Sequence, residues 1–239
     1  MVFQSLRKRG VVTIFHQMRI LGTAGSFSRD AWGPMEARRP VLVWMAAAFC
    51  TALALAICAM AIAHHRRLGV GLEVTARFAF LLFWPAYVGG ALTSLFGAVF
   101  LPLKSHAREL GLSFAAAIAV HLGLVATVCL VGQAPPLKTF AVFGAAVSCT
   151  YLLALLSVRR VRDALPANAW PPIRFVATNY ILYAFILDFR RNQTYDLIWV
   201  VKYLPFLALA ISAPIFRIAA WAKTALRPPA KKGLPRQSP

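Results

Sequence analysis

Long apolar runs separated by short basic segments dominate the hydrophobic pattern of this chain. A helix that crosses a bilayer needs about 20 mainly apolar residues, and the pattern predicts six such spans. We expect them at Val41–Ala63, Phe78–Leu103, Leu110–Val131, Thr139–Val158, Pro172–Phe189 and Leu197–Ile215. The fifth span is the most interrupted, because it contains Arg174, Asn179 and Asp188. The sequence therefore predicts an all-α membrane bundle of six helices.

The chain divides into three parts by composition. Residues 1–40 form a basic segment, in which residues 10–21 (GVVTIFHQMRIL) are typical of an interfacial helix or of a mobile tail. Residues 41–221 hold the six spans and form the transmembrane domain. Residues 222–239 are basic and rich in proline, and we expect this tail to be disordered.

The charge of the chain is strongly basic, at +19, but its distribution argues against nucleic acid as a partner. The basic residues lie in the tails and in the short loops between spans, which is typical of topology signals and of contacts with lipid headgroups. With both termini in the cytoplasm, 19 of the 26 Lys and Arg residues fall on the cytoplasmic side. We therefore expect an N-in, C-in protein of a bacterial inner membrane.

Motifs of soluble catalysis are absent from the sequence, which has no Gly-rich phosphate loop, no GxSxG and no HExxH. The four cysteines all fall inside apolar spans without CxxC spacing, so we interpret them as small buried hydrophobes rather than as a disulfide or zinc framework.

His121 is the only histidine well inside a predicted span, and an imidazole in hydrocarbon is by default a candidate functional residue. One interpretation is structural, with a neutral imidazole bonded to a helix carbonyl or to a polar neighbour such as Asn179, Ser148 or Thr150. The other interpretations are a haem or metal ligand and a proton-handling group.

The order of several motifs resembles a known family. The second span reads TARFAFLLFWPAYVGGALTSL, and the third opens with Arg108-Glu109-Leu110-Gly111-Leu112 followed by His121. LLALLSVRRVRDAL then ends the fourth span, and Trp170 precedes the fifth. From about residue 77 to 189 this order resembles the ferric reductase-like transmembrane domain, in particular the haem-binding membrane subunit of the bacterial methionine-sulfoxide reductase system.

The resemblance implies a b-type haem held between histidines of the third and fifth helices. It would make His121 one axial ligand to the haem iron. The two fifth-helix histidine positions of the family correspond to Arg174 and Leu187 here, and neither side chain can replace an imidazole. Tyr183 is the substitute that we expect near the depth of His121. His64 and His65 would lie too far toward the outer surface.

Three functions follow as expectations. The first is a membrane electron-transfer subunit that binds one haem b through His121 and acts, as an oxidoreductase subunit, with an outer-side redox protein. The second is a haem-free member of the fold that serves as a scaffold or assembly subunit for another membrane subunit. The third is transport, which is weaker because no buried acidic relay or inverted repeat is evident in the sequence.

Overall fold

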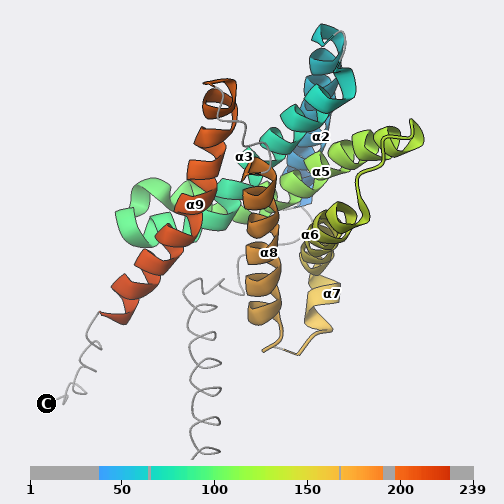
Figure 1. Cartoon of the computed structure of the whole chain (residues 1–239). Coiled ribbons are helices and arrows are strands. Elements are labelled where there is room, and N and C mark those ends of the chain that lie inside the picture. Colours follow the sequence, from blue (N-terminus) through green and yellow to red (C-terminus); the bar gives the residue numbers. More distant parts are fainter. Residues whose placement is uncertain (1–37, 64–65, 167, 191–196, 227–239) are drawn as a thin grey trace, which may run out of the picture.

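The computed structural model describes residues 38–63, 66–166, 168–190 and 197–226, and these form only helices and their connections (Figure 1). The predicted N-terminal interfacial helix, His64 and His65 lie outside the described residues. The elements are α2 (Arg38–Ile62), α3 (Arg67–Phe96), the short 3₁₀ helix η2 (Ala98–Phe100), α4 (Leu101–Ser105), α5 (Ala107–Leu130), α6 (Leu137–Leu156), α7 (Arg159–Asp163), α8 (Trp170–Arg190) and α9 (Leu197–Ala225).

Five helices of the described chain are long and apolar enough to cross a membrane. They cover Val41–Ile62, Arg67–Phe96, Ala107–Leu130, Leu137–Leu156 and Val200–Ala225. The chain is therefore an all-α integral membrane protein. The predicted fifth span also forms a helix, α8, but α8 is not one of the five, and it carries the charged residues Arg174, Asp188 and Arg190.

The second predicted span is displaced in the structure. We expected it to begin at Phe78, after the charged residues Glu73 and Arg77, but α3 already begins at Arg67. The helix tolerates these charges because the Arg77 guanidinium lies 3.3 Å from the Glu73 carboxylate, one turn away. At its other end α3 stops at Phe96, because the next residue, Gly97, has a φ of +85° that ends a helix.

The last predicted span continues further than expected. The apolar pattern suggested an end near Ile215, whereas α9 extends to Ala225, into the first residues of the predicted tail. Pro205 and Pro214 lie inside α9 and remove two backbone donors without ending the helix. The remainder of the tail, residues 227–239, lies outside the described part of the chain.

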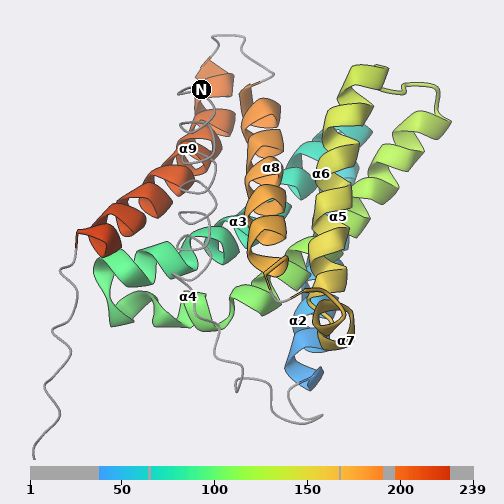
Figure 2. The same cartoon turned by 90° about the horizontal axis from the view of Figure 1, so that it is seen from below.

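Helix α3 lies at the centre of the bundle and contacts α2, α4, α5 and α9 (Figures 1 and 2). On the other side α6 packs mainly on α8, and α8 packs on α9. Figures 1 and 2 show that α5 slants across the direction of α8, and that α6 follows α5 and precedes α8 in the chain. Between α3, α5, α8 and α9 lies an aromatic cluster, which consists of Phe80, Phe83, Phe114, Phe185, Phe189 and Phe206.

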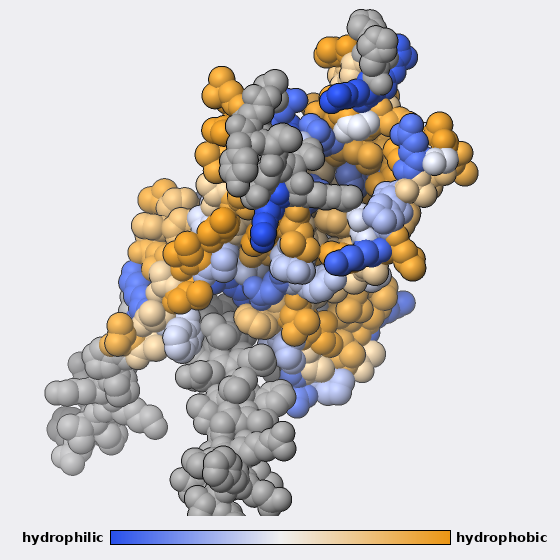
Figure 3. All heavy atoms as spheres, in the orientation of Figure 1, coloured by the Kyte–Doolittle hydropathy of each residue, from blue (hydrophilic) through white to orange (hydrophobic). Residues whose placement is uncertain are grey.

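The outer surface of the helices is largely apolar, as expected for a protein that faces lipid (Figure 3). The cysteines follow this pattern rather than the one we predicted. Cys50 and Cys58 are exposed, Cys129 and Cys149 are half-buried, and all four are free thiols. Cys50 and Cys58 are thus apolar surface positions, whereas Cys149 packs against the core cluster.

Close packing at Gly89 yields a first testable prediction. A Cβ atom at this position would lie 3.0 Å from the backbone carbonyl of Leu103, in the segment that follows α3. Gly89→Ala should therefore displace that backbone and destabilise the protein by about 1–3 kcal/mol, as overpacking does. The neighbouring Gly90 has open space at its Cβ position, so Gly90→Ala is the matched control. Thermal unfolding in detergent should show a lower midpoint for Gly89→Ala only; equal midpoints for the two variants would contradict the prediction.

Candidate functional site

His121 projects from α5 toward α3, not toward α8. Its Nδ1 atom lies 2.9 Å from the hydroxyl oxygen of Thr75, a fully buried residue of α3. The same hydroxyl is 2.8 Å from the carbonyl oxygen of Gly71, one turn earlier in α3. The candidate site is therefore a contact between α3 and α5.

The hydrogen bonds of Thr75 favour one tautomer of His121. A threonine hydroxyl has one proton, and if that proton is donated to the Gly71 carbonyl, the Thr75 oxygen accepts the Nδ1–H of the imidazole. In this tautomer Nε2 is the unprotonated nitrogen, which is the atom that binds iron in a haem-ligating histidine whose Nδ1–H is fixed by a hydrogen bond.

The space between α5 and α8 does not fit a haem. Phe114 of α5 and Phe185 of α8 have ring centroids 6.0 Å apart, and Phe83 of α3 lies 5.2 Å from the first and 5.8 Å from the second. All three side chains are buried. The aromatic cluster thus fills the interior between the two helices that hold the haem in the ferric reductase-like family.

Tyr183 and His121 have different surroundings in the structure. His121 lies two turns beyond Phe114 in α5 and is bonded to Thr75 of α3, whereas Tyr183 lies two residues before Phe185 in α8. Tyr183 is also half exposed on the outside of α8. It is not placed to serve as the second ligand.

The two positions that correspond to the family's histidines face elsewhere as well. Arg174 is exposed at the start of α8. Leu187 lines a cavity of about 310 Å³ between α6 and α8, together with Lys138, Thr139, Val142, Phe143 and Arg190. The structure brings neither position to His121.

The polar neighbours that we expected for His121 make other hydrogen bonds. Ser148 and Thr150 each donate to a carbonyl one turn earlier in α6. Asn179 of α8 accepts a 2.8 Å bond from the Tyr87 hydroxyl of α3. The sequence did not single out Thr75, the actual partner, because a threonine inside an apolar helix usually bonds only to its own backbone.

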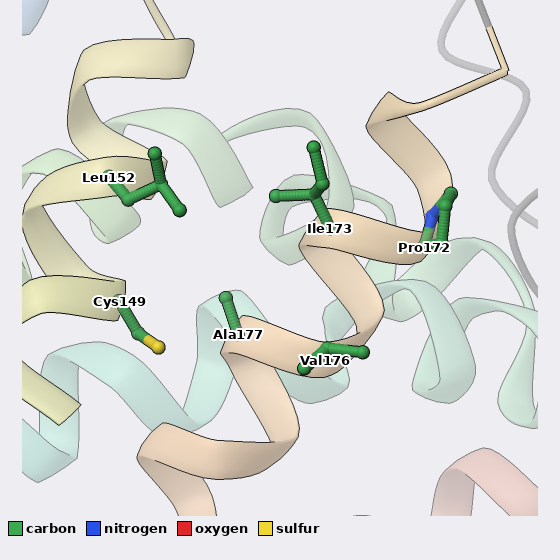
Figure 4. A pocket seen from close by; sticks show the side chains of 6 residues that line it. All are labelled: Cys149, Leu152, Pro172, Ile173, Val176 and Ala177. Carbon is green, nitrogen blue, oxygen red and sulfur yellow. The ribbon is translucent and has the colours of Figure 1, made fainter. Parts of the chain in front are cut away.

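An apolar pocket lies away from His121. It measures about 380 Å³ between α6 and α8 and is lined by Cys149, Leu152, Pro172, Ile173, Val176 and Ala177 (Figure 4). Among the described residues, no group of three or more His, Cys, Asp or Glu side chains is placed to hold a metal ion. His121 lines neither pocket.

A second polar group joins α3 to α9 near the start of α3. The Tyr203 hydroxyl donates a 2.8 Å hydrogen bond to the Glu73 carboxylate, which also pairs with Arg77. The Arg77 guanidinium lies over the Tyr203 ring at 4.7 Å from its centroid. We did not predict this group, although an acidic and a basic residue one turn apart beside an apolar span could have indicated it.

Comparison of the chain with protein-family models, with curated proteins and with solved structures finds no match.

The hydrogen bond between Thr75 and His121 can be tested with a double-mutant cycle. Thr75→Val and His121→Leu each remove one partner, and the double variant removes both. We expect a coupling energy of about 0.6 kcal/mol, the average for interhelical hydrogen bonds in membrane proteins, and not above about 2 kcal/mol. Unfolding free energies in mixed micelles measure it. Thr75→Ser, which keeps the hydroxyl, is the control, and strictly additive effects of Thr75→Val and His121→Leu would contradict the bond.

Proposed function

We propose that this chain is a haem-free membrane subunit that acts as a scaffold or assembly partner for another membrane or outer-side protein. The observation that carries the proposal is that the His121 imidazole is bonded to Thr75 of α3, while the aromatic cluster fills the interior between α5 and α8 two turns away. Under this proposal the chain shares the helix order of the ferric reductase-like family but does not carry out electron transfer through haem.

Energetics support a structural role for this interior. Truncating a buried phenylalanine to alanine costs about 3–5 kcal/mol in a packed core, and the cluster contains several buried rings in mutual contact, including Phe80 with Phe185 and Phe189 at 5.1 and 5.0 Å. Separating these rings to admit a haem would remove the ring contacts and their contribution to stability. His121, held against Thr75, then serves to fix α5 on α3.

Electron transfer through one b-type haem on His121 is the second candidate, and one observation favours it. The Nδ1–H bond to Thr75 leaves Nε2 in the protonation state that binds iron. A bound haem would supply one-electron chemistry. The ligand would be His121 alone, and no described histidine of α8 opposes it.

A visible spectrum of the purified protein separates the two candidates. For protein produced in haem-sufficient cells we expect no Soret band, in the oxidised form or after reduction with dithionite, because His121 is bonded to Thr75 of α3 and α8 offers no second histidine. The control is His121→Ala, which should have the same featureless spectrum. A Soret band in the wild-type protein that disappears in His121→Ala would establish the haem candidate instead.

The scaffold role predicts a stable complex. When the tagged chain is extracted from its native membrane in mild detergent, we expect a defined partner subunit at fixed stoichiometry by size-exclusion chromatography with mass determination. His121→Ala should retain that partner, because the imidazole is bonded to Thr75 within the chain. A monodisperse monomer in the native extract would contradict the scaffold role.

A further inference from the structure

Two arginines with no partner for their charge among the described residues lie where α8 begins and toward the end of α9. Arg217 of α9 packs its guanidinium over the Tyr87 ring of α3 at 4.5 Å and lies 5.7 Å from the ring of Phe175. Phe175 directly follows Arg174 in α8, which packs on α9. The two positive charges are therefore neighbours across the contact between α8 and α9.

The surrounding network fixes Arg217 but does not neutralise it. The Tyr87 hydroxyl donates to the Asn179 side-chain oxygen at 2.8 Å, and the Asn179 amide donates to the Phe175 carbonyl at 2.7 Å. These bonds hold the two rings under the guanidinium. Stacking uses the face of the guanidinium and leaves its N–H edge available for oxygen acceptors.

No acidic side chain of the described chain compensates this pair. Among the described residues, the salt bridges are those of Arg77 with Glu73 and of Arg162 with Asp163. Within the same residues, neither the Arg174 nor the Arg217 guanidinium makes a hydrogen bond or a salt bridge. Arg174 is exposed and Arg217 is half-buried, so both can reach a ligand that approaches from outside.

The pair lies at the level of a membrane interface. Arg174 precedes the end of α8 by 16 residues, and Arg217 follows the start of α9 by 20. At 1.5 Å per residue both lie roughly 24–30 Å from the opposite ends of these helices, which is close to the thickness of the hydrocarbon core. Trp170 and Trp221 flank the pair in the chain, and tryptophan is enriched at this depth.

We propose that Arg174 and Arg217 form a binding site for a phosphate group, which an anionic phospholipid headgroup would supply at this interface. Paired guanidiniums are the groups that proteins use to bind phosphate oxygens. Each basic side chain near an anionic membrane surface strengthens binding by about fivefold, so the pair contributes about thirtyfold. The site depends only on the membrane location of the chain and is independent of the haem question.

Native mass spectrometry of the full chain in detergent tests the site, with phosphatidylglycerol as the probe. Wild-type protein should bind phosphatidylglycerol about thirtyfold more tightly than the double variant Arg174→Gln/Arg217→Gln. Arg174→Gln alone, which removes an exposed group without a described contact, should weaken binding about fivefold. The double lysine variant Arg174→Lys/Arg217→Lys should bind between the two, because lysine keeps the charge but not the planar fork.

The matched control is Arg66→Gln/Arg67→Gln, which removes two exposed neighbouring charges between α2 and α3 and should keep the wild-type affinity. Inorganic phosphate is the second probe. If inorganic phosphate stabilises the wild-type protein but not the double glutamine variant, while phosphatidylglycerol binds both proteins equally, the ligand of the two arginines is a free phosphate. Equal lipid and phosphate binding by wild type and the double glutamine variant, or an equal loss in the control, would overturn the proposal.

Discussion

Hydrogen bonds from α3 to its neighbours satisfy polar groups that the surrounding hydrocarbon cannot. Thr75 accepts from His121 of α5, Trp84 donates to the Leu209 carbonyl of α9 at 2.7 Å, and Tyr87 donates to Asn179 of α8. Each unsatisfied group in lipid would cost several kcal/mol. These bonds therefore determine which faces of α5, α8 and α9 turn toward α3, and the apolar contacts fill the space that remains.

The orientation set by these bonds explains why the aromatic cluster and the histidine occupy different levels. Phe114 and His121 are seven residues apart, so both lie on the face of α5 that meets α3. Phe114 packs on Phe83, and His121 meets Thr75, two turns earlier in α3. One helix face thus has an aromatic contact at one level and a hydrogen bond at the other. The imidazole belongs to the packing of α3 on α5, and this favours the scaffold role.

The sequence predicted the helices well and their contacts poorly, for physical reasons. Apolar runs report which residues prefer lipid or core, so all six predicted spans form helices. The hydropathy pattern placed the start of α3 too late. The charges of Glu73 and Arg77 lower the local hydropathy, but Glu73 pairs with Arg77 and accepts a hydrogen bond from Tyr203, and hydropathy does not report such contacts. It also named His121 but not Thr75, since the facing residue depends on how two helices meet.

A comparison of two arginines shows that a counter-ion within the chain determines whether an arginine side chain remains available to bind an external anion. Arg77 and Arg217 both stack on tyrosine rings of a neighbouring helix, at 4.7 and 4.5 Å. Glu73 compensates the charge of Arg77 within the chain, so Arg77 needs no counter-ion from outside. Arg217 instead has Arg174 as its charged neighbour, and two cations so placed repel each other. An anion bound between the two guanidiniums would relieve this repulsion. Arginine stacked on tyrosine therefore joins α3 to α9 at Arg77, where Glu73 is the counter-ion, and at Arg217 it favours binding of a phosphate group.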